Sequence, residues 1–178
     1  LYGDNDLGKL KTIIAKQKLK TLNPFVNHQV INTRLNAGNA LKIIKEFDLV
    51  IDATDNFLTR YLINDACIIL GKPWIYGSIY KYEGQISVFN YKLGPSIRCL
   101  FDNVKDKKNI SEPAKTGLFG ILPGIIGSFQ ANEAIKILTG TGEPLSGKLL
   151  YYNILNNNTK IISFPKNEEN FQITSLTE

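Results

Sequence analysis

The stretch "DLVIDATDNFLTRYLINDAC", residues 48–67, decides the fold of this chain. Its first part, 48–54, is a near-continuous apolar run that predicts a buried strand, and a helical pattern over 56–70 follows at once. In an open parallel sheet, ligands bind beyond the carboxyl ends of the strands. The sequence therefore brings two carboxylates, Asp52 and Asp55, to a place where a ligand would bind.

The two aspartates carry different expectations. Asp52 lies inside the apolar run, where a carboxylate is costly unless it is paired or hydrogen-bonded, so it is either a satisfied structural acid or a binding group. Asp55 stands between Thr54 and Asn56, and all three are good helix N-cap residues. Asp55 therefore either caps the helix or holds Mg²⁺, which would bridge phosphate oxygens while Lys11 supplies a second positive charge.

Working outward, strand and helix patterns alternate up to residue 80 and change character after it. The elements that we expect are helices over 7–22, 36–47 and 118–138, strands over 28–35 and 73–80, an antiparallel extension over 83–91, a charged loop over 101–117 and a closing hairpin over 147–164. This order predicts one α/β domain with a mostly parallel sheet, helices on both faces and an antiparallel extension.

Composition narrows the class of protein. The 178 residues suffice for one domain with its own core, and the formal charge of +5 is mild. The lysines near the first helix carry no interleaved aromatic residues, so we expect a solvated face and no nucleic-acid partner. Polar residues interrupt the apolar helix over 118–138, which favours a buried helix over a membrane span. Cys67 and Cys99, with no signal peptide, favour a cytoplasmic protein with free thiols.

Five segments also resemble a known family. These segments, in the order and at the spacing of the ThiF/MoeB/HesA family, are LGKLK, DLVIDATDNFLTRYLINDAC, KPWIYGSIYKYEGQISVFN, IRCL and GIIGSFQANEAIKILTG. That family comprises bacterial relatives of ubiquitin-activating enzymes. The resemblance assigns residues 1–165 to a Rossmann-like adenylyltransferase domain and leaves 166–178 as a polar tail or linker.

The resemblance implies an adenylyltransferase that uses ATP and Mg²⁺. Its substrate would be the C-terminal glycine of a ubiquitin-fold sulfur-carrier protein of the molybdopterin or thiamine type. Lys11 would contact the ATP phosphates, Asp55 would be the magnesium-linked aspartate, and Asn56 would be its neighbour in the nucleotide site. A homodimer and a rhodanese-like or other sulfur donor are further partners that it implies. The chemistry fits, because an ionised carboxylate attacking phosphorus needs charge neutralisation and alignment rather than a protein base.

Three departures from the family pattern modify these expectations. The chain contains no GxGxxG, and the family's glycine-rich nucleotide loop would lie upstream, so we expect the C-terminal portion of an enzyme, inactive alone. The zinc-binding cysteine pairs of many members are reduced to Ser96 and Cys99, so we predict no zinc. Pro113 stands near the place of the loop cysteine of some relatives, which argues against a thioester or persulfide step there.

Several other residues keep alternatives open. Arg60 and Asn64 either orient the metal site or have a plain solvent or capping role, and Cys67 is interpreted as a small core residue. Gly84 is interpreted as a turn requirement. An aromatic set is divided between core packing and a platform for the carrier protein: Tyr76, Tyr80, Tyr82 and Phe89.

Three functions remain in view. The first is an adenylating enzyme, or the portion of one that carries Lys11 and Asp55. The alternative, from another class, is a non-catalytic module that binds the carrier protein and has lost ATP chemistry. A nicotinamide-dependent oxidoreductase would need the GxGxxG that this chain lacks.

Overall fold

A computed structural model describes residues 2–101 and 117–176, and the chain forms two compact units, Leu1–Leu35 and Asn36–Glu178. The first unit holds a short 3₁₀ helix, η1 (Asp4–Asp6), and α1 (Lys11–Leu22). An ion pair of 2.8 Å between Lys18 Nζ and Asp6 Oδ2 joins the two helices. The expected helix over 7–22 is thus confirmed, with its start four residues later.

The expected strand over 28–35 is wrong for the described structure. These residues do not form a strand. The described part of this unit contains no other strand or bridge with which they could pair. A strand exists through its ladder, so alternation of apolar and polar side chains does not produce one without a neighbour.

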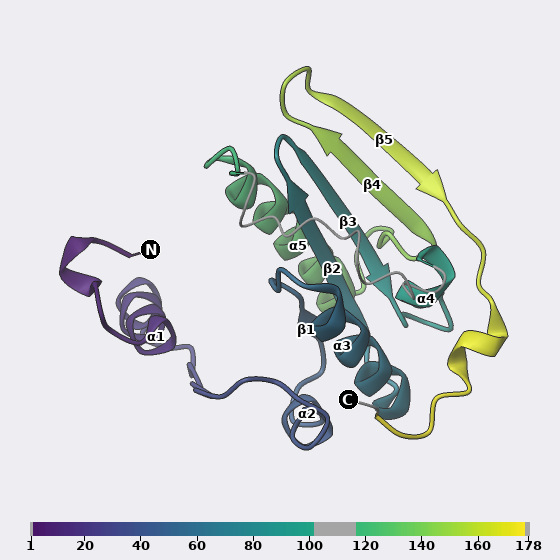
Figure 1. Cartoon of the computed structure of the whole chain (residues 1–178), viewed down its shortest axis with the longest axis horizontal. Coiled ribbons are helices and arrows are strands. Elements are labelled where there is room, and N and C mark those ends of the chain that lie inside the picture. The colour runs from purple at the N-terminus through teal and green to yellow at the C-terminus, as the bar shows by residue number, and fades with distance from the viewer. Residues whose placement is uncertain (1, 102–116, 177–178) are drawn as a thin grey trace. The chain divides into compact units, whose positions relative to one another are not determined.

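The second unit contains a sheet in the order β1-β2-β3-β4-β5 (Figure 1). The strands are β1 (Val50–Ile51), β2 (Trp74–Tyr80), β3 (Glu83–Phe89), β4 (Lys148–Asn153) and β5 (Asn158–Ser163). Among these strands only the β1–β2 pair is parallel, and the other three pairs are antiparallel. The predicted antiparallel extension and closing hairpin are therefore confirmed.

The prediction of a mostly parallel sheet is wrong for the described strands. After β2 the chain reverses within two residues, with Lys81 at φ 49°, so no helix crosses over before β3. A connection that short can join only antiparallel strands. Among the pairs of described strands, parallel pairing occurs between β1 and β2, where α3 (Phe57–Leu70) supplies the crossover.

Helices lie on both faces of the sheet, as expected, with α3 and α5 (Leu122–Thr139) on opposite sides in Figure 1. On the α5 face, Ile75, Ile86 and Val88 pack with Leu122 and Ile126 in the main apolar cluster. The opposite face carries an aromatic layer in which the Trp74 and Phe89 rings lie 5.0 Å apart. The shorter helices α2 (Ala40–Ile44) and α4 (Ile97–Leu100) both contact α3.

Gly84 is not a turn residue, in contrast to the expectation. It lies inside β3 with a negative φ, opposite Ile79 of β2. A Cβ at this position would overlap the side chain of Ile126, because α5 crosses the sheet there. Gly77 of β2 has the same role farther along α5, where a Cβ would overlap the amide of Gln130. The two glycines therefore let the helix approach the strands closely.

The aromatic set divides between core and surface. Tyr76 and Phe89 are buried, which confirms core packing for these two. Tyr82 is 43% exposed, and its role as part of a carrier platform stays a prediction.

Within residues 2–101 and 117–176, no helix has the length and apolar character needed to cross a membrane.

Candidate functional site

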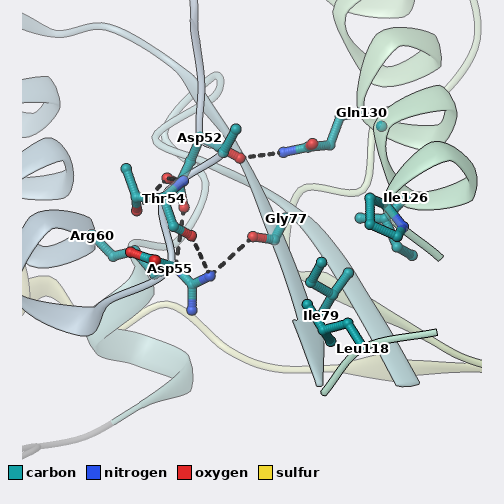
Figure 2. Close-up of a pocket in the computed structure, with 12 residues that line it drawn as sticks. Asp52, Thr54, Asp55, Arg60, Gly77, Ile79, Leu118, Ile126 and Gln130 are labelled. Atoms are coloured by element: carbon teal, nitrogen blue, oxygen red, sulfur yellow. Dashed lines mark hydrogen bonds and ion pairs between the residues drawn. The ribbon is translucent and has the colours of Figure 1, made fainter. Parts of the chain in front are cut away.

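A pocket of about 200 Å³ opens where β1 ends, beside the second half of β2 (Figure 2). One wall is polar and comes from the segment after β1 and from the first turn of α3. The other wall is mostly apolar and comes from β2 and the start of α5. Its lining includes Asp52, Thr54, Asp55 and Arg60 on the polar side, and Ile79, Leu118, Pro123 and Ile126 on the apolar side.

Asp52 is a satisfied structural acid with 1% of its surface exposed. Its Oδ1 accepts hydrogen bonds from Thr54 N at 2.8 Å and Thr54 Oγ1 at 2.6 Å, and its Oδ2 accepts one from Arg60 Nε at 3.2 Å. Burial raises the pKa of Asp52, while the Thr54 hydrogen bonds and the Arg60 charge oppose that rise. Because both carboxylate oxygens of Asp52 already accept hydrogen bonds, Asp52 is a poor metal ligand.

Arg60 is the centre of this polar wall. Only 5% exposed, it donates from Nη1 to Ser78 Oγ at 3.2 Å and from Nη2 to the carbonyls of Thr54 at 2.9 Å and Gly77 at 3.2 Å. Its guanidinium also lies 5.1 Å from the centre of the Tyr76 ring, a favourable cation–π distance. The plain solvent role considered from the sequence is therefore wrong for Arg60, since the aromatic layer and β2 enclose it.

Gln130 is a pocket residue to which sequence reasoning assigned no role. It is buried on α5, and its Nε2 donates to the Asp52 carbonyl at 2.6 Å and to the Ile75 carbonyl at 3.4 Å (Figure 2). The signal was present in the sequence, because Gln130 follows Ile126 by four residues and so shares the buried face of the helix. A lone amide on such a face needs a partner, and the end of β1 is that partner.

The helix cap is Asn56 and not Asp55. Asn56 Oδ1 accepts a hydrogen bond from Thr59 N at 2.9 Å, which satisfies a free amide of the first turn of α3. Asp55 is exposed on the pocket rim, and within the described part of the chain its side chain accepts one hydrogen bond, from Asn56 Nδ2 at 3.3 Å. Asp55 therefore keeps free lone pairs, whereas Asn56 has its oxygen engaged.

Lys11 is the first residue of α1, in the other unit, and its side chain is exposed. The first turn of α1 contains no acidic residue. A cation at a helix N-terminus adds to the positive end of the helix dipole, an arrangement that suits an anionic ligand rather than helix stability. Its pairing with Asp55 on one triphosphate stays a prediction, as do the roles assigned to both residues.

Asn64 and the two cysteines belong to the structural frame. Asn64 Oδ1 accepts a hydrogen bond from Ile97 N, the first amide of α4, at 3.2 Å. Cys67 is buried, which confirms the core interpretation, and burial raises the pKa of its thiol to about 12.

Cys99 lies against the C-terminal segment. Its Sγ accepts hydrogen bonds from Asn167 N at 3.3 Å and Asn170 Nδ2 at 3.5 Å, and Ser96 Oγ lies 3.6 Å away. Burial raises the pKa of Cys99, but these hydrogen bonds outweigh burial and bring the pKa below its ordinary value.

Among the residues that the structure describes, no three His, Cys, Asp or Glu side chains group to hold a metal ion. Pro113 and its loop lie outside the described residues.

Comparison with known proteins identifies relatives that match most of the chain. A sulfur carrier protein adenylyltransferase of Thermus thermophilus is 44% identical over 160 residues, which are 87% of this chain and 59% of that protein. A probable molybdopterin-synthase adenylyltransferase of Porphyra purpurea is 47% identical over 167 residues, or 93% of this chain and 42% of that protein. The chain thus spans about half the length of the curated relatives it matches.

A solved structure, that of E. coli MccB, has the same fold, with a TM-score of 0.78 at 21% identity over 94% of this chain and 50% of that chain. The model of the ThiF family matches residues 1–173. With this match over nearly the whole chain and two relatives more than 40% identical, the chain belongs to the ThiF family.

Proposed function

We propose that the protein containing this chain activates the C-terminal carboxylate of a ubiquitin-fold sulfur-carrier protein by adenylylation with ATP. The observation that carries this proposal is the asymmetry of the two aspartates at the pocket. Asp52 is neutralised by Arg60 and Thr54, whereas Asp55 is exposed on the rim with lone pairs free. The relatives in Thermus thermophilus and Porphyra purpurea, both named adenylyltransferases, support the reaction class.

The pocket suits the end of a peptide better than a nucleotide base. Its apolar wall offers Ile79, Leu118 and Ile126 to an uncharged backbone, and its polar wall lies at the opposite side. A slim terminus such as glycine fits a volume of about 200 Å³. Apolar lining also keeps water from the reacting carboxylate, which limits hydrolysis of the activated acyl group.

The residues present fit a magnesium ion, with Asp55 as the protein ligand. Mg²⁺ is commonly held by one or two carboxylates together with substrate phosphates and water, so one free carboxylate is a sufficient protein share. When bound, the ion would neutralise charge on the phosphates that the incoming carboxylate must approach. Lys11 would bind the same phosphates through its ammonium group, and Asn56 would hold the adjacent helix end in place.

The test is ATP–pyrophosphate exchange by the full-length protein in the presence of its carrier protein. We expect Asp55→Asn to lower the exchange rate by about 10²-fold, the cost of removing one preorganised electrostatic contact. Asp48→Asn is the matched control, because Asp48 is an exposed acid just before β1 and away from the pocket lining. Exchange at the normal rate by Asp55→Asn would refute the role of this site.

A second pair of variants tests the lysine. Lys11→Ala should raise the KM for ATP, while Lys16→Ala, an exposed lysine on the same helix, should leave it unchanged. Carrier binding without any exchange by the full-length wild-type protein would instead favour the non-catalytic carrier-binding module.

A further inference from the structure

We propose that Arg60 and Gln130 form a two-sided clamp on Asp52 that sets the position of Asp55, and that both are positioning residues for adenylylation. The inference rests on the proposed function. Arg60 holds the carboxylate of Asp52 from the α3 side, and Gln130 holds its carbonyl from the α5 side (Figure 2). The segment that carries Asp55 thus has one anchor in each helix layer.

The clamp is needed because the strand ends before Asp55. β1 has two residues. The last backbone hydrogen bond between this segment and β2 is donated by Asp52 N to the Ile75 carbonyl, at 2.9 Å. Beyond that point the sheet gives no further support until α3 begins at Phe57. Among the described residues, the side-chain hydrogen bonds at Asp52 and Thr54 involve the Asp52 carboxylate, Arg60 and Gln130, and Asn56 Nδ2 donates to Asp55 itself.

Arg60 holds this segment at more than one point. Its Nε engages the carboxylate of Asp52, and its Nη2 engages the Thr54 carbonyl, the residue directly before Asp55. The same Nη2 also reaches the Gly77 carbonyl, which ties the segment to β2. A planar guanidinium makes these bonds in fixed directions, a geometry that a lysine ammonium does not reproduce.

Arg60 also decides which aspartate presents charge to the pocket. Its side chain is 6% exposed and that of Asp52 is fully buried, so the pair is neutral and closed to solvent. Loss of the arginine would leave a second uncompensated carboxylate beside Asp55, where a triphosphate must bind. The clamp therefore fixes the position of Asp55 and makes it the one available carboxylate of the polar wall described here.

The test measures segment mobility and catalysis separately in the full-length protein. Hydrogen exchange of peptides covering 52–59, without ATP, should become faster in Arg60→Gln and in Gln130→Leu. In ATP–pyrophosphate exchange, kcat should fall by about 10²-fold for Arg60→Gln, the cost of a displacement of about 1 Å, while KM for the carrier stays within about threefold. Arg60→Lys should also lose at least about tenfold in kcat, since it keeps the charge and loses the fork.

Arg98→Gln is the matched control. Arg98 forms an ion pair with Asp65 of α3 at 2.6 Å, also beside an aromatic ring, and neither residue lines the pocket. We expect this variant to lose stability and to keep kcat and the exchange rate over 52–59. An equal loss of kcat in Arg98→Gln, a wild-type kcat in Arg60→Lys, or unchanged hydrogen exchange in Arg60→Gln would overturn the clamp.

The design keeps two failures apart. If Asp55→Asn is active, the proposed site is wrong. If Asp55→Asn is inactive while the Arg60 and Gln130 variants behave as wild type, only the clamp is wrong. Should Arg60→Gln not fold, Gln130→Leu decides alone, because it removes the two hydrogen bonds that Gln130 Nε2 donates and introduces no buried charge.

Discussion

Replacing Gly77 by alanine tests how closely α5 approaches the sheet at the pocket. The new Cβ would overlap the Gln130 side chain, whose Nε2 donates to the Asp52 carbonyl at 2.6 Å. Gln130 must therefore move, and the buried carbonyl loses its donor, at a cost of about 1–3 kcal/mol. Crowding of the packed helix adds about 1–3 kcal/mol. We expect the free energy of unfolding to fall by about 2–6 kcal/mol in Gly77→Ala.

Urea denaturation of the purified variants measures this loss. Gly127→Ala is the control, because Gly127 lines the same pocket from an exposed position on α5, and its Cβ would meet nothing within 4 Å. Alanine in a helix interior is favoured over glycine, so this variant should gain up to about 1 kcal/mol.

A double-mutant cycle isolates the cause. In a Gln130→Ala background the overlap disappears, and Gly77→Ala should then cost less than about 1 kcal/mol. If Gly77→Ala lowers the free energy of unfolding as much in that background as in the wild type, the overlap with Gln130 does not cause the loss of stability.

Three further outcomes are expected. Asn56→Ala should lower the free energy of unfolding by about 1 kcal/mol, because it removes the cap of α3, and Asn56→Ser should retain most of it in the same urea assay. Titration of the native protein with a thiol reagent at pH 8 should modify Cys99 first, because its pKa is lowered, and leave buried Cys67 unreacted; rapid labelling of Cys99→Ser would contradict this. Because the pKa of Cys67 is raised in the folded protein, only the unfolded chain ionises this thiol between pH 9 and about 12. The free energy of unfolding should therefore fall as pH rises through that window, and the fall should be smaller in Cys67→Ala.

The sequence predicted most elements of the second unit, because their signals are local. The periodic apolar pattern and Gly71 define α3, and Gly71 takes the left-handed conformation with φ 63°. The alternation over 83–91 and the Asn-rich turn identified β3 and the closing hairpin for the same reason. The balance of parallel and antiparallel pairing was wrong because it depends on which strands become neighbours, and that is a property of the whole sheet.

The candidate site was predictable in part. Its aspartates follow from their place at a strand end, and the position of Asp52 inside an apolar run required that its carboxylate be paired or hydrogen-bonded. Thr54 and Arg60 satisfy the carboxylate of Asp52, whereas its carbonyl is bonded by Gln130, which is far away in the sequence. Spacing gives no distance between such residues, so the clamp and the packing role of Gly84 became visible only in three dimensions.

The β3–β4 ladder, which pairs Ile86 with Leu150, has a consequence for the order of folding. The β2–β3 and β4–β5 hairpins close over short turns, and hairpins of this kind form within about 1–10 μs. Joining the two hairpins requires closure of a long intervening segment that includes α5, and such non-local pairing slows folding. We expect pulse labelling during refolding to protect both hairpin turns before the amides shared by β3 and β4.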